Sequence, residues 1–367
     1  MYSFELTILG ASGGPEGGVT QCFMVRPSGT RGVESICVDG GAGAGQITRM
    51  IARYGPYANP DMVESFYAND VEPAAKFFDA YSNMEFGLPS HITTYLENKE
   101  GLCNTRMKAI EIYNGIKEYY VTHAHLDHIS EMVLNSPLAY EDNPSLASKK
   151  IWGLDFTVEA LKKHLFNDLV WPDLVSDNER FQLGTLKDLK SHRCSVFPQW
   201  DIIPLQVNHG HGAVLTMKRV YSTVYLFRDR ETKNCLLVCG DIEADFSLGA
   251  EKSLFCRLLK YIAGHVDQGK LRGIVIECSS SMSTDESQLY GHLSPVHLVD
   301  ALVRLQNMYA GKDSLKGLEV IISHVKRVSA RLDPRLTILD EIREQALLKG
   351  LEGIIFSMAV HGFTFHL

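Results

Sequence analysis

The residues best suited to chemistry lie in one short stretch, residues 122–128, which holds three histidines and one aspartate. Imidazole nitrogens and carboxylate oxygens together suit divalent metals such as zinc or manganese. A purely structural role would need a separate explanation for each of four clustered side chains. The stretch therefore predicts a metal site, and its candidate ligands are His123, His125, Asp127 and His128.

The flanking sequence indicates how these side chains are positioned. An interrupted apolar run, residues 116–121, comes before them, and a helix-like apolar segment, residues 129–134, follows. We expect a strand and then a helix. The four side chains would then lie in the connecting loop, where they can converge on one point instead of alternating between two faces.

Three more ligand-type residues follow apolar strand-like runs further along the chain: His209, Asp241 and His324. His211 competes with His209, which we favour because it directly ends its strand. A two-metal centre needs about seven protein ligands, with an acid preferred as the bridge. Four residues from the loop and three from the strand ends would complete such a set if the strand ends share one sheet edge.

The composition sets limits on compartment and partner. The chain has 367 residues, 45% apolar content and a net charge of −8. It has no apolar stretch of membrane-spanning length and no N-terminal signal pattern. Eight scattered cysteines, none in a C-x-x-C pair, favour reduced thiols and a cytoplasmic location. The acidic balance argues against a nucleic-acid polymer as partner, whereas a cationic metal pocket would suit a small anionic substrate.

Apolar patterning predicts an α+β chain that forms a single domain over residues 1–367. A mostly antiparallel region is expected between residues 182 and 238, and an α/β region follows it. Ser294-Pro295 and Asp333-Pro334 are typical helix starts. Residues from about 55 to 115 indicate a helical insertion, which would be either simple surface packing or a substrate lid or dimer contact. Expected strands include residues 4–9, 21–25, 35–38, 149–154, 271–277, 318–323 and a final strand at 353–357.

The ligand order resembles that of the metallo-β-lactamase fold, in which H-x-H-x-D-H is followed by His, Asp and His. This resemblance implies an αββα sandwich. It also implies that Asp39, at the end of a predicted strand, supports the metal loop, and the alternative is an ordinary turn aspartate. The implied ligands are His123, His125 and His209 for one metal and Asp127, His128 and His324 for the other, with Asp241 as the bridge.

Further sequence blocks lie at residues 135–137, 166–173, 221–223, 239–241, 277–279, 291–295 and 333–339. Together they resemble the class II cyclic-nucleotide phosphodiesterases of fungi, and the likeness extends nearly throughout the chain but is least over residues 55–115. The resemblance implies that two divalent ions, preferably zinc, hold a hydroxide that hydrolyses 3′,5′-cyclic AMP to the 5′-nucleotide. Cyclic GMP would be a second candidate substrate, and the protein would be a homodimer.

The departing 3′ oxygen needs a proton, and His292 is the candidate donor because it is not required as a ligand. Glu277, which ends the preceding strand, would orient His292, while Asp127 and Asp241 would act in catalysis as metal carboxylates. The alternative role of His292 is helix capping. Two other functions stay open: a tRNA 3′-processing endoribonuclease of the same fold, and a non-catalytic cyclic-nucleotide-binding protein.

Overall fold

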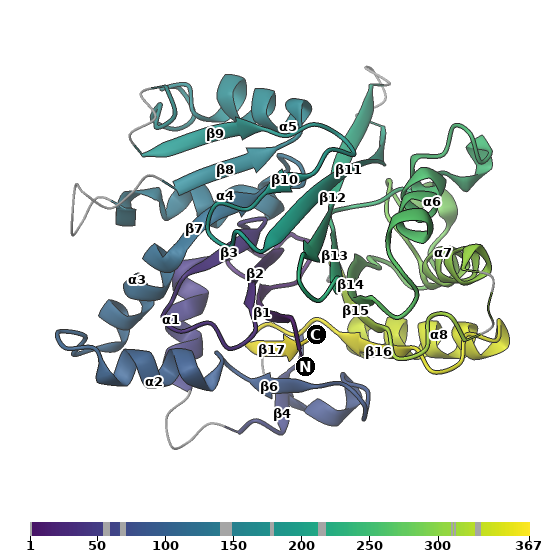
Figure 1. Cartoon of the computed structure of the whole chain (residues 1–367), viewed down its shortest axis with the longest axis horizontal. Coiled ribbons are helices and arrows are strands. Elements are labelled where there is room, and N and C mark those ends of the chain that lie inside the picture. Colours follow the sequence, from purple (N-terminus) through teal and green to yellow (C-terminus); the bar gives the residue numbers. More distant parts are fainter. Residues whose placement is uncertain are drawn as a thin grey trace. The chain divides into compact units, whose positions relative to one another are not determined.

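The structure is a computed structural model that describes residues 2–53, 59–66, 71–139, 149–176, 180–211, 218–309, 311, 313–326 and 332–367. Contacts divide the chain into two compact units (Figure 1). Unit 1 comprises residues 1–60, 83–198 and 360–367, and unit 2 comprises residues 61–82 and 199–359. None of the helices among the described residues is both long and apolar enough to span a bilayer.

Unit 1 is built on a mixed sheet with the strand order β6-β17-β1-β2-β3-β7-β8-β9. The pairs from β6 to β3 are antiparallel, and those from β3 to β9 are parallel. The strands of this sheet are β1 (Phe4–Gly10), β2 (Cys22–Pro27), β3 (Ser35–Val38), β6 (Met84–Phe86), β7 (Ile116–Tyr120), β8 (Lys149–Gly153), β9 (Phe181–Thr185) and β17 (Phe363–His366). The two-residue strand β10 (His192–Arg193) also lies among the residues of unit 1 but is not part of this sheet.

Helices supply the other half of the unit 1 core. Ile47 and Ile112 are fully buried with Tyr119 and Ile151 of the sheet in one apolar cluster. The helices are α1 (Ala44–Arg53), α2 (Ser90–Asn98), α3 (Thr105–Gly115), α4 (Leu126–Leu134) and α5 (Asp155–Ala160), with the short turns η2 (Ser136–Ala139) and η3 (Leu161–Leu165).

Unit 2 contains a sheet in which β11, β12 and β13 are antiparallel and β13, β14, β15 and β16 are parallel. Its strands are β11 (Trp200–His211), β12 (Arg219–Asp229), β13 (Cys235–Cys239), β14 (Leu271–Glu277), β15 (Glu319–Ser323) and β16 (Ile355–Met358), with a separate pair, β4 (Met62–Glu64) and β5 (Val71–Pro73). Its helices are α6 (Leu254–His265), α7 (Pro295–Met308) and α8 (Pro334–Leu348), with the turns η1 (Ala74–Lys76), η4 (Asp245–Leu248) and η5 (Glu286–Gln288).

The strand directions in unit 2 bring several chain ends to one sheet edge. Parallel strands β13, β14 and β15 end together, so the residues that follow them share that edge. Strand β11 runs in the same direction as β13, because each is antiparallel to β12. The edge therefore collects the ends of four strands from a stretch of more than one hundred residues.

The region of the expected insertion is divided between the units. Residues 61–82 join unit 2 through Arg335, whose guanidinium lies 4.3 Å from the Phe66 ring centroid and 4.7 Å from that of Phe77. Arg335 also pairs with Asp333 at 2.7 Å and donates to the Glu64 carbonyl at 2.7 Å. Residues 83–115 contribute β6, α2 and α3 to unit 1. Residues 55–58 and 67–70 lie outside the described residues, and the single domain stays a prediction.

One local expectation is wrong for an identifiable reason. Residues 353–357 do not form the last strand, because β17 follows and pairs with β1 from the other end of the chain.

Candidate metal centre

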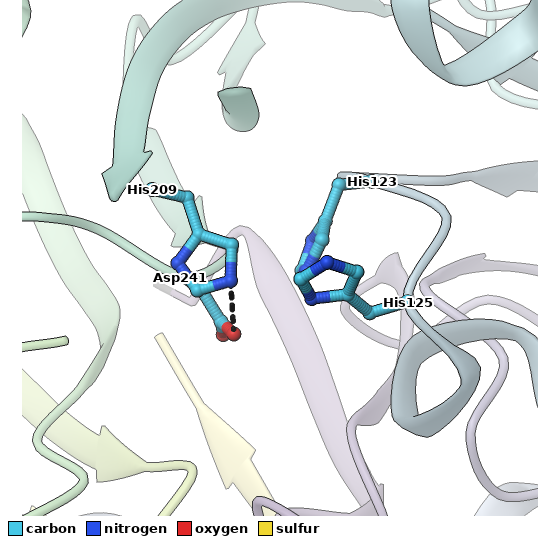
Figure 2. A group of neighbouring side chains, drawn as sticks. All are labelled: His123, His125, His209 and Asp241. Atoms are coloured by element: carbon cyan, nitrogen blue, oxygen red, sulfur yellow. Dashed lines mark ion pairs between the residues drawn. The ribbon is translucent and has the colours of Figure 1, made fainter. Parts of the chain in front are cut away.

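The histidine-rich stretch of unit 1 joins β7 to α4. His123 and His128 are buried and His125 is exposed. The ring centroid of His123 lies 4.4 Å from that of His125 and 4.2 Å from that of His128. Figure 2 shows the His123 and His125 rings turned toward one another. The stretch is not entirely a loop as expected, because α4 begins at Leu126 and places Asp127 and His128 in its first turn.

Asp39 anchors this stretch from the end of β3. One carboxylate oxygen accepts the Thr122 backbone N–H at 2.7 Å, and the other contacts the Thr122 hydroxyl at 2.9 Å and His128 Nδ1 at 2.8 Å. The side-chain amide of Gln21 donates to it at 3.0 Å. Asp39 is fully buried and adopts a φ of 60°, a conformation that costs a non-glycine residue energy and is often found at functional sites. This geometry agrees with the expected supporting role.

Glycine brings the end of β3 close to α4. A Cβ on Gly41 would lie 2.0 Å from the Asp127 carbonyl oxygen and 2.4 Å from Thr20 Oγ1. The neighbouring Gly40 N–H donates to the His128 carbonyl at 2.6 Å. Any larger residue at position 41 would therefore clash with the first turn of α4, which carries Asp127, and would separate it from the end of β3.

In unit 2 the carboxylate of Asp241 lies between two imidazoles. Its Oδ2 is 3.4 Å from His209 Nε2, the ion pair drawn in Figure 2, and its Oδ1 is 3.3 Å from His324 Nε2. All three residues are at least 95% buried. Each oxygen of one carboxylate thus faces a different histidine, which is the arrangement that a bridging ligand between two cations requires.

The candidate histidines share a common orientation. His209 Nδ1 contacts the Gly291 carbonyl at 3.0 Å, and His324 Nδ1 contacts Ser279 Oγ at 2.9 Å. In unit 1, His123 Nδ1 lies 3.1 Å from Thr122 Oγ1. Histidines that bind metals usually hold one ring nitrogen in such a contact and present the other to the ion. The pattern leaves Nε2 as the ligand atom in each ring.

The structure distinguishes His209 from His211. His209 is buried against Asp241, whereas His211 is exposed. The reason given from the sequence is wrong, because β11 does not end at His209 but continues to His211. Its register with β12 shifts between Asn208 and His211, and Gly210 adopts a φ of 74°. This irregularity breaks the alternation of faces, so position in the strand alone does not determine which histidine points inward.

Glu277 and His292 form a buried pair beside Asp241. His292 Nδ1 lies 2.9 Å from Glu277 Oε1, 3.3 Å from Ser279 Oγ and 3.7 Å from Asp241 Oδ2. Burial alone lowers the pKa of His292, but the two carboxylates outweigh it, and the pKa lies above its usual value. Burial alone raises the pKa of Glu277, but His292 outweighs it, and the pKa lies below its usual value. The pair therefore favours a protonated imidazole on an ionised carboxylate.

The unit 2 cluster also shows features that sequence reasoning missed. Ligand atoms of Asp241, His292 and His324 lie within 4.8 Å of one another, so His292 is itself within reach of a cation that the other two bind. Ser279 contacts His324, His292 and Glu277 at once. Ser279 belongs to the block 277–279 that the sequence analysis singled out, but that signal does not reveal a contact with residue 324.

The donor sets fit divalent cations. Unit 1 brings together His123, His125, Asp127 and His128, with Asp127 Oδ2 4.0 Å from His128 Nε2. Unit 2 brings together Asp241 with four other residues of the predicted site, namely His209, Glu277, His292 and His324. Both sets combine imidazole nitrogen with carboxylate oxygen, which suits zinc or another first-row divalent ion.

Comparisons with known proteins place the chain in a family. Residues 36–362 match the model of the class-II cAMP phosphodiesterases. The chain is 44% identical over 373 residues to 3′,5′-cyclic-nucleotide phosphodiesterase 1 of Saccharomyces cerevisiae, with 100% of both chains covered. The crystal structure of unliganded yeast PDE1 aligns with a TM-score of 0.94 at 43% identity, again over 100% of both chains.

A more distant structure identifies the fold. The metallo-β-lactamase fold protein YhfI from Bacillus subtilis aligns over 100% of both chains with a TM-score of 0.53 at 13% identity. This likeness confirms the expected metallo-β-lactamase fold, and the family match confirms the expected relationship. The chain belongs to the class-II cAMP phosphodiesterases.

Proposed function

We propose that this chain hydrolyses 3′,5′-cyclic AMP to 5′-AMP, with cyclic GMP as a second candidate substrate. The observation that carries the proposal is the Asp241 carboxylate, whose two oxygens face the Nε2 atoms of His209 and His324. That arrangement supports a two-metal hydrolytic centre, and the family match supports a cyclic nucleotide as the substrate.

The proposed centre holds two ions. His123, His125 and His209 would hold one ion and Asp127, His128 and His324 the other, with Asp241 as the bridge. Two bound zinc ions would supply Lewis acidity for the attacking water and neutralise charge on the phosphate. The Nδ1 contacts described above support this assignment, because they would leave Nε2 of each ring to contact an ion.

His292 is the proposed proton donor to the departing 3′ oxygen. Its Nδ1 is held by Glu277 at 2.9 Å, which leaves Nε2 to reach the substrate. Glu277 in turn accepts the Ile242 backbone N–H at 2.9 Å, so the carboxylate has a fixed orientation. A histidine held in this way can deliver a proton without first having to be positioned. The negative charge of Glu277 also stabilises the positive charge that the donor needs.

The direct test is to prepare metal-free protein, restore zinc and follow cyclic AMP by chromatography. We expect conversion to 5′-AMP that begins with zinc and stops with a chelator. The absence of turnover in protein with full metal occupancy would overturn the proposal.

The same preparation separates the rival functions. The tRNA 3′-processing activity predicts that a precursor tRNA is cleaved faster than cyclic AMP is hydrolysed, whereas we expect no cleavage by a chain of net charge −8. The non-catalytic alternative predicts tight cyclic AMP binding without metal, whereas we expect metal-free protein to bind it weakly.

We also propose a cytoplasmic location and a homodimer. All eight cysteines are free thiols, and seven of them are buried, as expected in a reducing compartment. Fluorescence microscopy of a tagged chain tests the location, and sedimentation equilibrium tests the dimer through a mass twice the 41.0 kDa of one chain.

A further inference from the structure

Tyr290 stands out on the surface of unit 2. It lies two residues before His292, and its side chain is 75% exposed. Its φ is 51°, in the left-handed region. A bulky aromatic residue with positive φ is a genuine outlier, because its Cβ crowds the backbone. Among the described non-glycine residues, positive φ also occurs at Asp39 and His324 of the candidate site and, outside it, at Asp168, Leu189 and Lys233.

The turn that carries Tyr290 is fixed to the candidate site by its backbone. The His292 N–H donates to the Leu289 carbonyl at 3.1 Å, and the Gly291 carbonyl contacts His209 Nδ1 at 3.0 Å. A Cβ on Gly291 would lie 2.8 Å from the Gly210 nitrogen, so the two backbones are in close contact. The turn thus touches a candidate metal ligand and leads directly into the candidate proton donor.

The side chain of Tyr290 does not account for its strained backbone. An exposed ring gains little from packing, and glycine or asparagine would adopt the same φ at lower cost. Strained residues that persist without a packing reason are concentrated at ligand-binding positions. Tyr81 is a useful contrast in the same unit, since it is 84% exposed and its φ lies outside the left-handed region.

We propose that Tyr290 is a substrate-binding residue whose ring stacks on the purine base while His292 faces the cyclic phosphate. The inference rests on the proposed function and extends it to base recognition. An exposed aromatic face suits a base, because stacking requires a flat π surface and no hydrogen-bond partner. The cyclic phosphate fixes one end of a rigid nucleotide, so an anchor for the base must lie near the proton donor, as Tyr290 does in the sequence.

The experiment measures steady-state kinetics of the zinc-loaded enzyme with the variants Tyr290→Asn, Tyr290→Phe and Tyr81→Ala. Asparagine tolerates the left-handed region, so Tyr290→Asn removes the ring and preserves the turn. We expect Tyr290→Asn to raise the KM for cyclic AMP about 5- to 100-fold, as for the loss of one base–aromatic stack, with kcat within about threefold. Tyr290→Phe should retain the wild-type KM, and Tyr81→Ala should change neither constant.

A substrate without a base separates stacking from a general disturbance of the site. On a methyl riboside 3′,5′-cyclic phosphate, Tyr290→Asn should behave as the wild type does. An equal loss of activity on both substrates, or an unchanged KM for cyclic AMP, would overturn the inference. A change of oligomeric state in sedimentation without a change in KM would also overturn it.

The backbone strain provides an independent readout. Tyr290→Gly should unfold at the same temperature as the wild type or higher, because glycine relieves the strain, and it should share the raised KM of Tyr290→Asn. A clear fall in melting temperature would contradict the inference, since it would assign the ring a packing role. If the zinc-loaded wild type does not hydrolyse cyclic AMP, the proposed function itself fails; if only the effect of Tyr290 is absent, the function stands and this inference fails.

Discussion

The two units contribute their ligand-type residues in opposite ways. Unit 1 supplies four of them from six consecutive positions, 123–128, and the carboxylate of Asp39 contacts the Thr122 backbone and His128 there. Unit 2 supplies His209 from within β11 and Asp241 and His324 from beyond the ends of β13 and β15, and only the sheet brings these three residues together.

This difference determines how each cluster of ligand-type residues should respond to a substitution. The unit 1 cluster depends on local chain geometry and one ionic anchor, so a change at Asp39 should affect several ligands together. The unit 2 cluster depends on the order and direction of the strands, and each histidine has its own contact through Nδ1. A single change there should affect one ligand, except at Asp241, which both histidines face.

The largest effect is expected from Asp241→Ala. Removal of the proposed bridge should release one or both ions and reduce activity by more than ~100-fold, beyond the ~10- to 100-fold typical of residues that only support ligands. Metal analysis by mass spectrometry alongside kinetics measures both effects, with Asp245→Ala as a control at another buried aspartate of unit 2. Unchanged metal content would remove Asp241 from the bridge.

His292→Ala should follow, with kcat slowed by ~10²–10⁴, the usual contribution of a general acid. Both ions should remain bound, because the proposal gives His292 no metal to hold. Because His292 lies close to Asp241 and His324, the metal content of the variant is the decisive control. Loss of an ion would make His292 a ligand and would increase the share of ligands that unit 2 supplies.

Asp39→Asn and Ser279→Ala compare the supports of the two units directly. Asp39→Asn should weaken zinc binding by ~10- to 100-fold, because an ionised carboxylate holds His128 and the Thr122 backbone. Ser279→Ala should weaken it less, since the hydroxyl that contacts His324 is neutral. Competition with a fluorescent zinc chelator measures both affinities. The reverse order would contradict the contrast between one shared anchor and separate contacts.

Two buried charges predict smaller and opposite pH effects on stability. Burial lowers the pKa of Lys149 in unit 1 from 10.5 to about 7, so the folded state binds fewer protons than the unfolded state between these values. Its contribution to stability therefore rises with pH over that window. Burial raises the pKa of Glu319 in unit 2 from 4.5 to about 7, so its contribution falls as the pH rises from about 4.5 to 7.

Glu319→Gln should accordingly stabilise the protein by about 1–3 kcal/mol at pH 8 and little at pH 4.5. The stability of Lys149→Met relative to that of the wild type should fall as the pH rises from 7 toward 10.5. Urea unfolding at several pH values measures both trends. Parallel pH trends in the stability of the two variants would show that burial does not set the pKa values of Lys149 and Glu319.

Sequence patterns predicted well where the cause of the structure is local. Ser294 and Asp333 start α7 and α8 as expected, because a hydroxyl or carboxylate caps the first turn and proline follows. Periodicity was less reliable away from the caps. On α8, Ala346 is buried whereas the neighbouring Leu347 is 74% exposed, so apolar character alone does not identify the inward face. Leu169 is likewise 90% exposed although it is apolar.

In the candidate site, too, local sequence patterns were predictable and contacts that depend on strand register were not. The spacing of the 123–128 cluster is visible in the sequence, and Asp241 and His324 each follow a strand that composition indicates. The contact of Ser279 with His324 and the inward turn of His209 were not predictable. They depend on strand register and on an irregularity at Gly210, neither of which has a local sequence signal.

The proposed function depends on a two-metal centre in this chain, with Asp241 as its bridge. Its most direct test is a stoichiometric titration of metal-free protein with zinc, with cyclic AMP hydrolysis measured at each addition. We predict that activity reaches its maximum at two zinc ions per chain and that either Asp39→Asn or Asp241→Ala shifts or abolishes this end point. Full activity at one ion per chain, or activity without any, would contradict the account.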